Sequence, residues 1–278
     1  MALDARAFTA FERMAHDRIA GSYAEHFAPL TGLSLEPLLD AAGVAAGQRV
    51  LDVATGPGVA AAAAQARGAA ATGVDVSPEM VALARRAHPG IEFRTADAVA
   101  LPFPDGAFEA VVCNFALGHF PEPEAALAEG ARVLAPNGAL AMSWWDLPAR
   151  QRVQGLFREV IAELGLSAPP EVPQGHDTLR FSDPDAFAAL LRGAGLVDAS
   201  VAAHRTIHRM PDVEALWRAG LGGMAVTASA IASRDAATQA RAREALVRRA
   251  EAYRGPRGLE IPIAFFIGAG RKPATPEG

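Results

Sequence analysis

The pattern of apolar and polar positions divides the chain into a helical beginning and an α/β core. Residues 3–28 place apolar side chains at helical spacing, and a second short helix is predicted over 35–42 with Ser34 as its N-cap. From residue 49, short apolar runs alternate with helical stretches, which is typical of βαβ units around a buried parallel sheet. We therefore predict an N-terminal helical cap at 1–44 and a ligand-binding α/β core at 45–146.

Five strands and three helices are expected inside this core. Ser77 and Pro78 support the prediction of the helix over 78–87, because they supply an N-cap followed by a proline at the first helical position. The predicted strands cover 49–54, 70–75, 91–95, 108–115 and 138–144, and the predicted helices cover 58–67, 78–87 and 122–135.

The alternation weakens after the fifth predicted strand. A helix is expected over 149–165, followed by a proline-rich stretch and a loop, so 147–180 is interpreted as an insertion or lid. Residues 181–278 are expected to complete the sheet, with a helix at 183–193 capped by Ser182 or Asp183 and strands at 197–208 and 259–269. A second helical insertion is predicted at about 212–253.

Composition and charge exclude several classes. The chain has 278 residues, of which 51% are hydrophobic and 21% charged, as in ordinary folded proteins. Its 26 basic and 31 acidic residues give a net charge of −5, which disfavours nucleic acid as a partner. The single cysteine, Cys113, excludes an intrachain disulfide. With no secretory leader and no apolar run near the ~20 residues of a membrane span, we expect a cytoplasmic protein.

The strongest motif is Val50-Leu51-Asp52-Val53-Ala54-Thr55-Gly56-Pro57-Gly58-Val59, a strand that enters a glycine turn and then a helix. Gly56 and Gly58 lack a Cβ, so the backbone can turn tightly and approach a ligand. The helix that follows directs its free N–H groups at that ligand. The glycine spacing alone also satisfies the dinucleotide-binding pattern, so other residues must decide between ligands.

Acidic residues at successive strand ends favour a ligand that carries positive charge. Asp52 lies inside the first strand, Asp75 closes the second, and Asp97 follows the third. S-adenosylmethionine fits this pattern, because it carries a sulfonium and an ammonium and has no pyrophosphate. Asp75 could bind both ribose hydroxyls, and Asp97 could accept a hydrogen bond from the adenine amino group.

At these motifs the chain closely resembles the class I S-adenosylmethionine-dependent methyltransferases. The resemblance is greatest to the branch that contains ubiquinone- and menaquinone-biosynthesis C-methyltransferases and small-molecule methyltransferases. It rests on the glycine motif and on residues 73–80, 96–98 with 101–103, 108–113 and 134–138. It implies a Rossmann-like, doubly wound, seven-stranded sheet with an antiparallel last strand.

The resemblance also implies a site for S-adenosylmethionine, whose product would be S-adenosylhomocysteine. The glycine turn would lie against the methionine part of the donor, and Asn114 would face the same end. Asp75 would lie at the ribose, and the adenine would be bordered by residues after the second and third strands. The predicted donor-binding residues are Asp52, Ala54, Thr55, Gly56, Gly58, Asp75, Val76, Met80, Asp97, Ala98 and Asn114.

Residues for the methyl acceptor are less specific. His119 follows the fourth strand, and Tyr23 and His26 lie at i, i+3 spacing, which would place them on one helical face. Asp146 follows the fifth strand, where at most one of its neighbours Trp144 and Trp145 is expected to meet the acceptor. The predicted catalytic residues are His119, Tyr23, His26 and Asp146, and the predicted substrate-binding residues are Trp145, His176 and Arg180.

The functional hypothesis is therefore methyl transfer to a small, aromatic or bicyclic metabolite, on carbon, oxygen or nitrogen. A nicotinamide-dependent oxidoreductase is an alternative, but the chain lacks a Tyr-x-x-x-Lys motif because Lys272 is its only lysine. A non-catalytic donor-binding protein is another, and an RNA methyltransferase is disfavoured by the charge. No metal site is expected, since no histidine–carboxylate cluster with ligand spacing is evident, and the oligomeric state stays open.

Overall fold

A single mixed sheet organises the computed structural model, which describes residues 4–173 and 175–274; Leu3 of the first predicted helix lies outside them. Seven strands follow one another in the order β3-β2-β1-β4-β5-β8-β6, and the short β7 pairs with β8. The first five are parallel, and β8 runs antiparallel to both β5 and β6. The strands are β1 Arg49–Val53, β2 Ala70–Asp75, β3 Glu92–Thr95, β4 Phe108–Asn114, β5 Leu134–Trp145, β6 Val197–Met210, β7 Arg254–Gly255 and β8 Gly258–Arg271.

The chain reverses direction across the sheet between β1 and β4. From β1 it proceeds to β2 and β3 on one side, and from β4 it proceeds to β5 on the other. Right-handed crossovers in opposite directions place their helices on opposite faces, so the predicted doubly wound, Rossmann-like fold with an antiparallel last strand is confirmed. The helices involved are α4 Val59–Ala66, α5 Pro78–Ala87 and α6 Pro123–Val133, and α8 Pro184–Gly193 packs beside α6. Such a reversal point is where open α/β sheets bind their ligands.

The N-terminal region is less regular than the predicted helix over 3–28. Helix α1 covers Ala5–Ser22, and the chain continues as the π-helix η1 (Tyr23–Phe27), α2 (Ala28–Thr31), the 3₁₀ turn η2 (Gly32–Ser34) and α3 (Leu35–Ala41). The predicted capping role of the Ser34 side chain is wrong. Its single hydroxyl proton instead has two acceptors within reach, the Thr31 carbonyl at 2.9 Å and Asn114 Oδ1 at 2.6 Å, because the preceding turn already continues into the helix.

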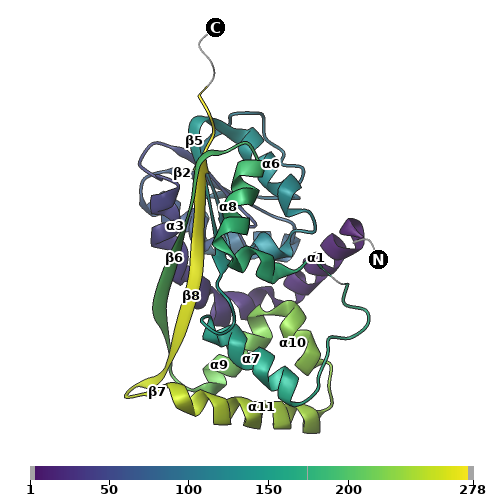
Figure 1. Cartoon of the computed structure of the whole chain (residues 1–278). Coiled ribbons are helices and arrows are strands. Elements are labelled where there is room, and N and C mark those ends of the chain that lie inside the picture. Colours follow the sequence, from purple (N-terminus) through teal and green to yellow (C-terminus); the bar gives the residue numbers. More distant parts are fainter. Residues whose placement is uncertain (1–3, 174, 275–278) are drawn as a thin grey trace.

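Four helices gather at one end of the molecule, below the sheet in Figure 1. They pack closely because α9 carries glycines at its contacts. A Cβ on Gly220 would lie 1.9 Å from Phe157 of α7, and a Cβ on Gly223 would lie 2.0 Å from Phe27 of η1. The four are α7 Arg152–Glu163, α9 Val213–Gly223, α10 Ala225–Ala232 and α11 Ala236–Ala250, followed by the turn η5 Glu251–Tyr253. None of the described helices is long and apolar enough to cross a membrane.

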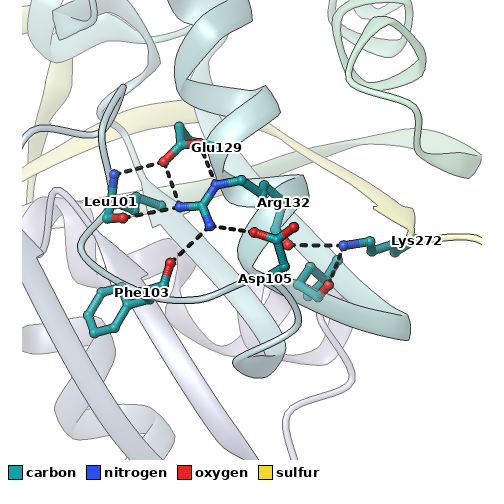
Figure 2. Close-up of polar contacts among 7 residues, drawn as sticks. Leu101, Phe103, Asp105, Glu129, Arg132 and Lys272 are labelled. Carbon is teal, nitrogen blue, oxygen red and sulfur yellow. Dashed lines mark hydrogen bonds and ion pairs between the residues drawn. The ribbon is translucent and has the colours of Figure 1, made fainter.

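A polar cluster around Arg132 fixes the loop between β3 and β4, as Figure 2 shows. The Arg132 guanidinium bonds to the Glu129 carboxylate at 2.6 Å and to Asp105 at 2.7 Å. It also donates to the carbonyls of Leu101 and Phe103 in that loop. Lys272, at the end of β8, donates to the Arg132 carbonyl at 3.0 Å and to the Leu134 carbonyl at 2.7 Å. The loop that contains Asp97 is therefore tied to α6, and through Arg132 to the residue that follows the last strand.

Candidate active site

A cavity of about 350 Å³ lies over the carboxyl ends of β1, β2, β4 and β5. Helix α1 and the junction between α9 and α10 contribute its other walls. Twelve of the residues predicted for the site border it: Tyr23, Ala54, Gly56, Asp75, Val76, Met80, Asp97, Ala98, Asn114, His119, Trp145 and His176. Asp52, Thr55, Gly58, His26, Asp146 and Arg180 do not.

The glycine turn at one end of the cavity is held in the left-handed backbone region. The φ angles are 56° at Ala54, 52° at Gly56 and 87° at Gly58. A Cβ built on Gly56 would meet no atom within 4 Å, whereas one on Gly58 would lie 2.8 Å from the Phe93 ring. Gly56 thus leaves open space for a ligand beside the backbone, and Gly58 is needed for packing behind the turn.

Asp75 joins the end of β2 to this turn. Its Oδ2 accepts from the Gly56 N–H at 2.8 Å and its Oδ1 from the Ser77 N–H at 2.9 Å. Burial raises the pKa of Asp75, although these two hydrogen bonds counteract the rise. Each carboxylate oxygen keeps a second lone pair, so the group can accept further hydrogen bonds from ligand hydroxyls.

Asp52 lies behind the turn and not on the cavity wall. Its Oδ2 accepts from the Thr55 hydroxyl at 2.6 Å and from the Ala61 N–H at 3.0 Å, which braces the turn against the start of α4. Burial raises the pKa of Asp52 to about 7. Its Oδ1 is buried with no hydrogen-bond partner among the residues described. An unpaired buried carboxylate oxygen beside an open turn is compatible with a cationic ligand.

The walls beside Asp75 are mixed apolar and acidic. Met80 is 1% exposed and Ala98 is 8% exposed, and both border the cavity together with Val76. Asp97 lies on the same wall, and its Oδ1 accepts from the Val99 N–H at 3.2 Å. The arrangement offers an apolar slot with a carboxylate at its edge, which suits a purine ring that carries an amino group.

Asn114 borders the cavity but its side chain is already hydrogen-bonded within the protein. Its Oδ1 accepts from the hydroxyls of Ser34 and Ser143, both at 2.6 Å, and its Nδ2 donates to the Thr31 carbonyl at 3.1 Å. These bonds connect the N-terminal segment to β4 and β5. Asn114 therefore has a structural role whatever its contact with a ligand.

Aromatic rings form the opposite end of the cavity. Phe115 has a φ of 54°, which is unusual for a bulky residue, and its ring stacks on Trp145 with centroids 3.6 Å apart. Trp144 also borders the cavity, so both tryptophans line the space in which an acceptor could lie. Because successive residues of a strand face opposite sides, the cavity receives these two side chains from both faces at the end of β5.

A carboxylate and two imidazoles meet where α1 crosses the cavity. Glu12 Oε2 lies 3.0 Å from His119 Nδ1 and 3.4 Å from His16 Nδ1. All three residues border the cavity. One carboxylate oxygen of Glu12 and one ring nitrogen of each histidine lie within 4.8 Å of one another. The sequence pattern pointed only to His119 and to no histidine–carboxylate cluster. The i, i+4 spacing of Glu12 and His16 was an available signal, but their approach to His119 depends on the fold.

Tyr23 borders the cavity and His26 does not. Burial raises the pKa of Tyr23 to about 12, so its phenol stays protonated near neutral pH and can donate a hydrogen bond. The expected shared face of these two residues is wrong, because the segment is a π-helix with i to i+5 bonding and not an α-helix.

Three other predicted residues are already engaged in contacts within the protein. Asp146 forms two 2.6 Å bonds with Arg150 and a third with the Leu147 N–H. Arg180 pairs with Glu124 and stacks over Phe181. His176 borders the cavity, and its Nε2 lies 3.1 Å from the Phe120 carbonyl. Of these three, only His176 is positioned to touch a ligand in the cavity.

Comparison with known proteins decides the family. A profile of a methyltransferase domain matches residues 51–142. A demethylmenaquinone methyltransferase of Thermus thermophilus is 38% identical over 165 residues, which cover 53% of this chain and 74% of that protein. The chain belongs to the class I S-adenosylmethionine-dependent methyltransferases. A demethylmenaquinone methyltransferase of Renibacterium salmoninarum is 37% identical over 153 residues, covering 55% of this methyltransferase and 61% of the relative.

Solved structures share the fold of this methyltransferase at lower identity. The YcgJ protein of Bacillus subtilis superimposes with a TM-score of 0.57 at 20% identity, covering 87% of this chain and 99% of that one. The cyclase SpnF superimposes with a TM-score of 0.52 at 21% identity, covering 88% of this chain and 82% of that one. The fold therefore also occurs in a protein named for a different reaction, and it does not define the acceptor.

Proposed function

We propose that this methyltransferase transfers a methyl group from S-adenosylmethionine to a small aromatic or bicyclic acceptor. The proposal rests on one cavity whose two ends differ in chemistry. Asp75, Asp97 and the glycine turn border one end, and the rings of Phe115 and Trp145 border the other. A polar, cationic donor suits the first end, and a planar apolar acceptor suits the second. Relatives that are named demethylmenaquinone methyltransferases favour a fused-ring acceptor.

The donor-binding roles follow from the contacts of each residue. Asp75 would accept the ribose hydroxyls, and Gly56 would let the methionine part approach the backbone. Val76, Met80 and Ala98 would enclose the adenine, with Asp97 at its amino edge. Asp52 and Thr55 would act from behind by holding the turn. When bound, S-adenosylmethionine supplies a methyl group that is activated by the sulfonium.

The task left to the protein is to orient the acceptor and to exclude water. Such orientation is worth up to roughly 7–11 kcal/mol of barrier. The stacked Phe115 and Trp145 rings offer a flat surface for a planar acceptor, and Tyr23 can donate a hydrogen bond to it. His119 also borders the cavity, so its imidazole could accept a proton from an acidic acceptor atom.

Calorimetric titration with S-adenosylmethionine, S-adenosylhomocysteine, NAD and NADP tests the donor half. We expect saturable binding of the two adenosyl-sulfur ligands alone. Asp75→Asn should weaken that binding about 10- to 150-fold, the equivalent of a lost hydrogen bond to a charged group. Asp40→Asn is the matched control, because Asp40 lies on α3, is exposed and pairs with Arg67 after α4. Binding of dinucleotides alone would support the oxidoreductase alternative.

Turnover tests the acceptor half. The protein is incubated with S-adenosylmethionine and a panel of naphthols, naphthohydroquinones and monocyclic phenols, and S-adenosylhomocysteine is quantified by mass spectrometry. We expect acceptor-dependent formation of S-adenosylhomocysteine with at least one fused-ring compound. Tight donor binding without turnover on any member of a broad panel would favour the non-catalytic alternative.

A further inference from the structure

We propose that Glu12 is a positioning residue that holds the His119 imidazole with its proton on Nδ1 and thereby leaves Nε2 as the proton acceptor toward the methyl acceptor. This inference rests on the proposed function, because it assigns a task to a residue in the acceptor half of the same cavity. Glu12 lies on α1, and His119 ends the 3₁₀ turn η3 (Leu117–His119) after β4. The two residues meet only in the folded protein.

The contact defines which imidazole nitrogen carries the proton. Glu12 Oε2 lies 3.0 Å from Nδ1 of His119. A carboxylate only accepts hydrogen bonds, so Nδ1 must donate and the neutral ring must be the Nδ1–H tautomer. No group in the described parts of the chain bonds to Nε2 of His119. Because His119 borders the cavity and its side chain is 40% exposed, Nε2 is the nitrogen available to a ligand.

The charges around the pair support an ionised carboxylate. Burial works to raise the pKa of Glu12, but the nearby His119 and His16 lower it below its usual value. Burial works to lower the pKa of His119, whereas the charge and hydrogen bond of Glu12, together with the charge of Asp75, raise it above its usual value. Glu12 on α1 and Asp75 at the end of β2 are the charged groups that act on this imidazole, and the His16 ring lies against it with centroids 5.0 Å apart.

The Glu12 carboxylate is not what attaches α1 to the core. Asp17, later on the same helix, accepts from the Ser77 hydroxyl at 2.6 Å and from the Glu79 N–H at 3.3 Å. Helix α1 also packs against α5 and α9. Loss of the Glu12 charge should therefore alter the imidazole more than the position of the helix, and Asp17 provides a matched control.

In the reaction, the new bond from the acceptor atom to the methyl carbon forms as the carbon–sulfur bond breaks and its electron pair stays on sulfur. An acceptor that begins protonated must also lose a proton, which passes to Nε2 of His119. The resulting imidazolium is stabilised by the Glu12 carboxylate and later releases the proton to solvent. The products are the methylated acceptor, S-adenosylhomocysteine and one proton.

Imidazole NMR tests this assignment without an acceptor. The ¹⁵N-labelled imidazole signals are recorded across pH for wild type, Glu12→Gln and Asp17→Asn, each with and without S-adenosylhomocysteine, and His119→Gln assigns the signal. We expect neutral His119 of the wild type to carry its proton on Nδ1. In Glu12→Gln we expect His119 to gain the Nε2–H tautomer. We also expect the His119 imidazole to bind its second proton about 3- to 10-fold more weakly. Asp17→Asn should behave as wild type, because the asparagine Oδ1 can still accept the two hydrogen bonds that attach α1.

Three outcomes would overturn the inference. One is an Nε2–H tautomer of neutral His119 in the wild type, a result that does not depend on the folding of Glu12→Gln. Another is an unchanged tautomer and titration in Glu12→Gln. The third is stoichiometric binding of Zn²⁺ that is lost in Glu12→Gln, because the cluster would then be a metal site. Absence of S-adenosylhomocysteine binding in the same samples would instead count against the proposed function and leave the imidazole result standing.

Discussion

Two aspartates at the ends of adjacent strands have different positions in the site. Asp75 lies on the cavity wall, 8% exposed, whereas Asp52 is 1% exposed behind the glycine turn. The sequence motif suggests the same ligand-facing task for both. The structure separates them because Asp52 is engaged by Thr55 and by the start of α4, and so supports the backbone that a ligand would touch.

Gly56 provides a sharp test of close backbone approach. Gly56→Ala places a methyl group in space that is empty in the folded protein, at a φ of 52°. We expect a loss of about 1 kcal/mol in the free energy of unfolding, from the left-handed backbone, and at least tenfold weaker S-adenosylhomocysteine binding by calorimetry, because the ligand competes for that space.

Gly43→Ala separates the two effects. Gly43 has a φ of 62°, and a Cβ added there would also meet no atom within 4 Å, but this glycine does not border the cavity. The variant should lose similar stability in denaturant unfolding while binding the ligand as wild type does. Equal ligand affinity in the two variants would rule out close approach at Gly56.

At the scale of elements, the contact between α1 and η3 should make stability depend on pH. Glu12 has a lowered pKa, so its contribution is present above its usual value of 4.5 and is lost as the pH falls through the lowered value. His119 has a raised pKa, so its contribution is present below its usual value of 6.5 and is lost as the pH rises through the raised value. The ion pair is therefore fully effective between about pH 4.5 and 6.5.

Denaturant unfolding of wild type and His119→Asn across pH measures this contribution. We expect the difference in unfolding free energy to be largest inside that window, by roughly 0.5–1 kcal/mol because the imidazole is partly exposed and screened by solvent. The difference in unfolding free energy between the two proteins should decline above pH 6.5, as His119 loses its proton. His26→Asn is the control. His26 does not border the cavity, and its pair with Glu25 is longer, at 3.7 Å, and involves an exposed carboxylate. A difference that does not vary with pH would contradict the ion pair.

The elements that the sequence predicted well are those with strong local signals. Strand β2 and helix α5 have their predicted bounds, since one is a buried apolar run and the other begins at Ser77 and Pro78 with a true side-chain cap. The π-helix η1 could not be predicted, because apolar spacing there is compatible with a continuous α-helix. Its Phe27 packs against Gly223 of α9, a contact set by the tertiary fold.

At the scale of the whole molecule, the cavity wall near the glycine turn could be predicted from the sequence more completely than the aromatic end. Gly56, Asp75 and Asp97 come from one contiguous motif region, so strand ends alone placed them at the sheet edge that borders the cavity. The aromatic end depends on distant pairs, because Glu12 meets His119 across 107 positions and Trp144 meets the Thr178 carbonyl across 34. Such pairs follow from how the helices pack, which no local pattern encodes.

The same packing bears on how the protein unfolds. Phe27, Phe157 and Leu246 belong to one continuous hydrophobic core with Leu51 and Val111 of the sheet. Although the sequence suggests divisions near residues 44, 146 and 180, we expect the cap, core and helical block to unfold together. Calorimetry should give a single transition with equal calorimetric and van't Hoff enthalpies.

Ligand binding extends this prediction, because the cavity is bordered by the glycine turn, α1 and the junction of α9 and α10. S-adenosylhomocysteine at 100 times its Kd should add about 2.7 kcal/mol to the free energy of unfolding, or roughly 5–10 °C in Tm. Near-ultraviolet dichroism follows the tryptophans, and far-ultraviolet dichroism follows the helices. Both signals should shift by the same amount. A separate transition at lower temperature, whose midpoint does not change with the ligand, would show that the helical block folds on its own and only borders the site.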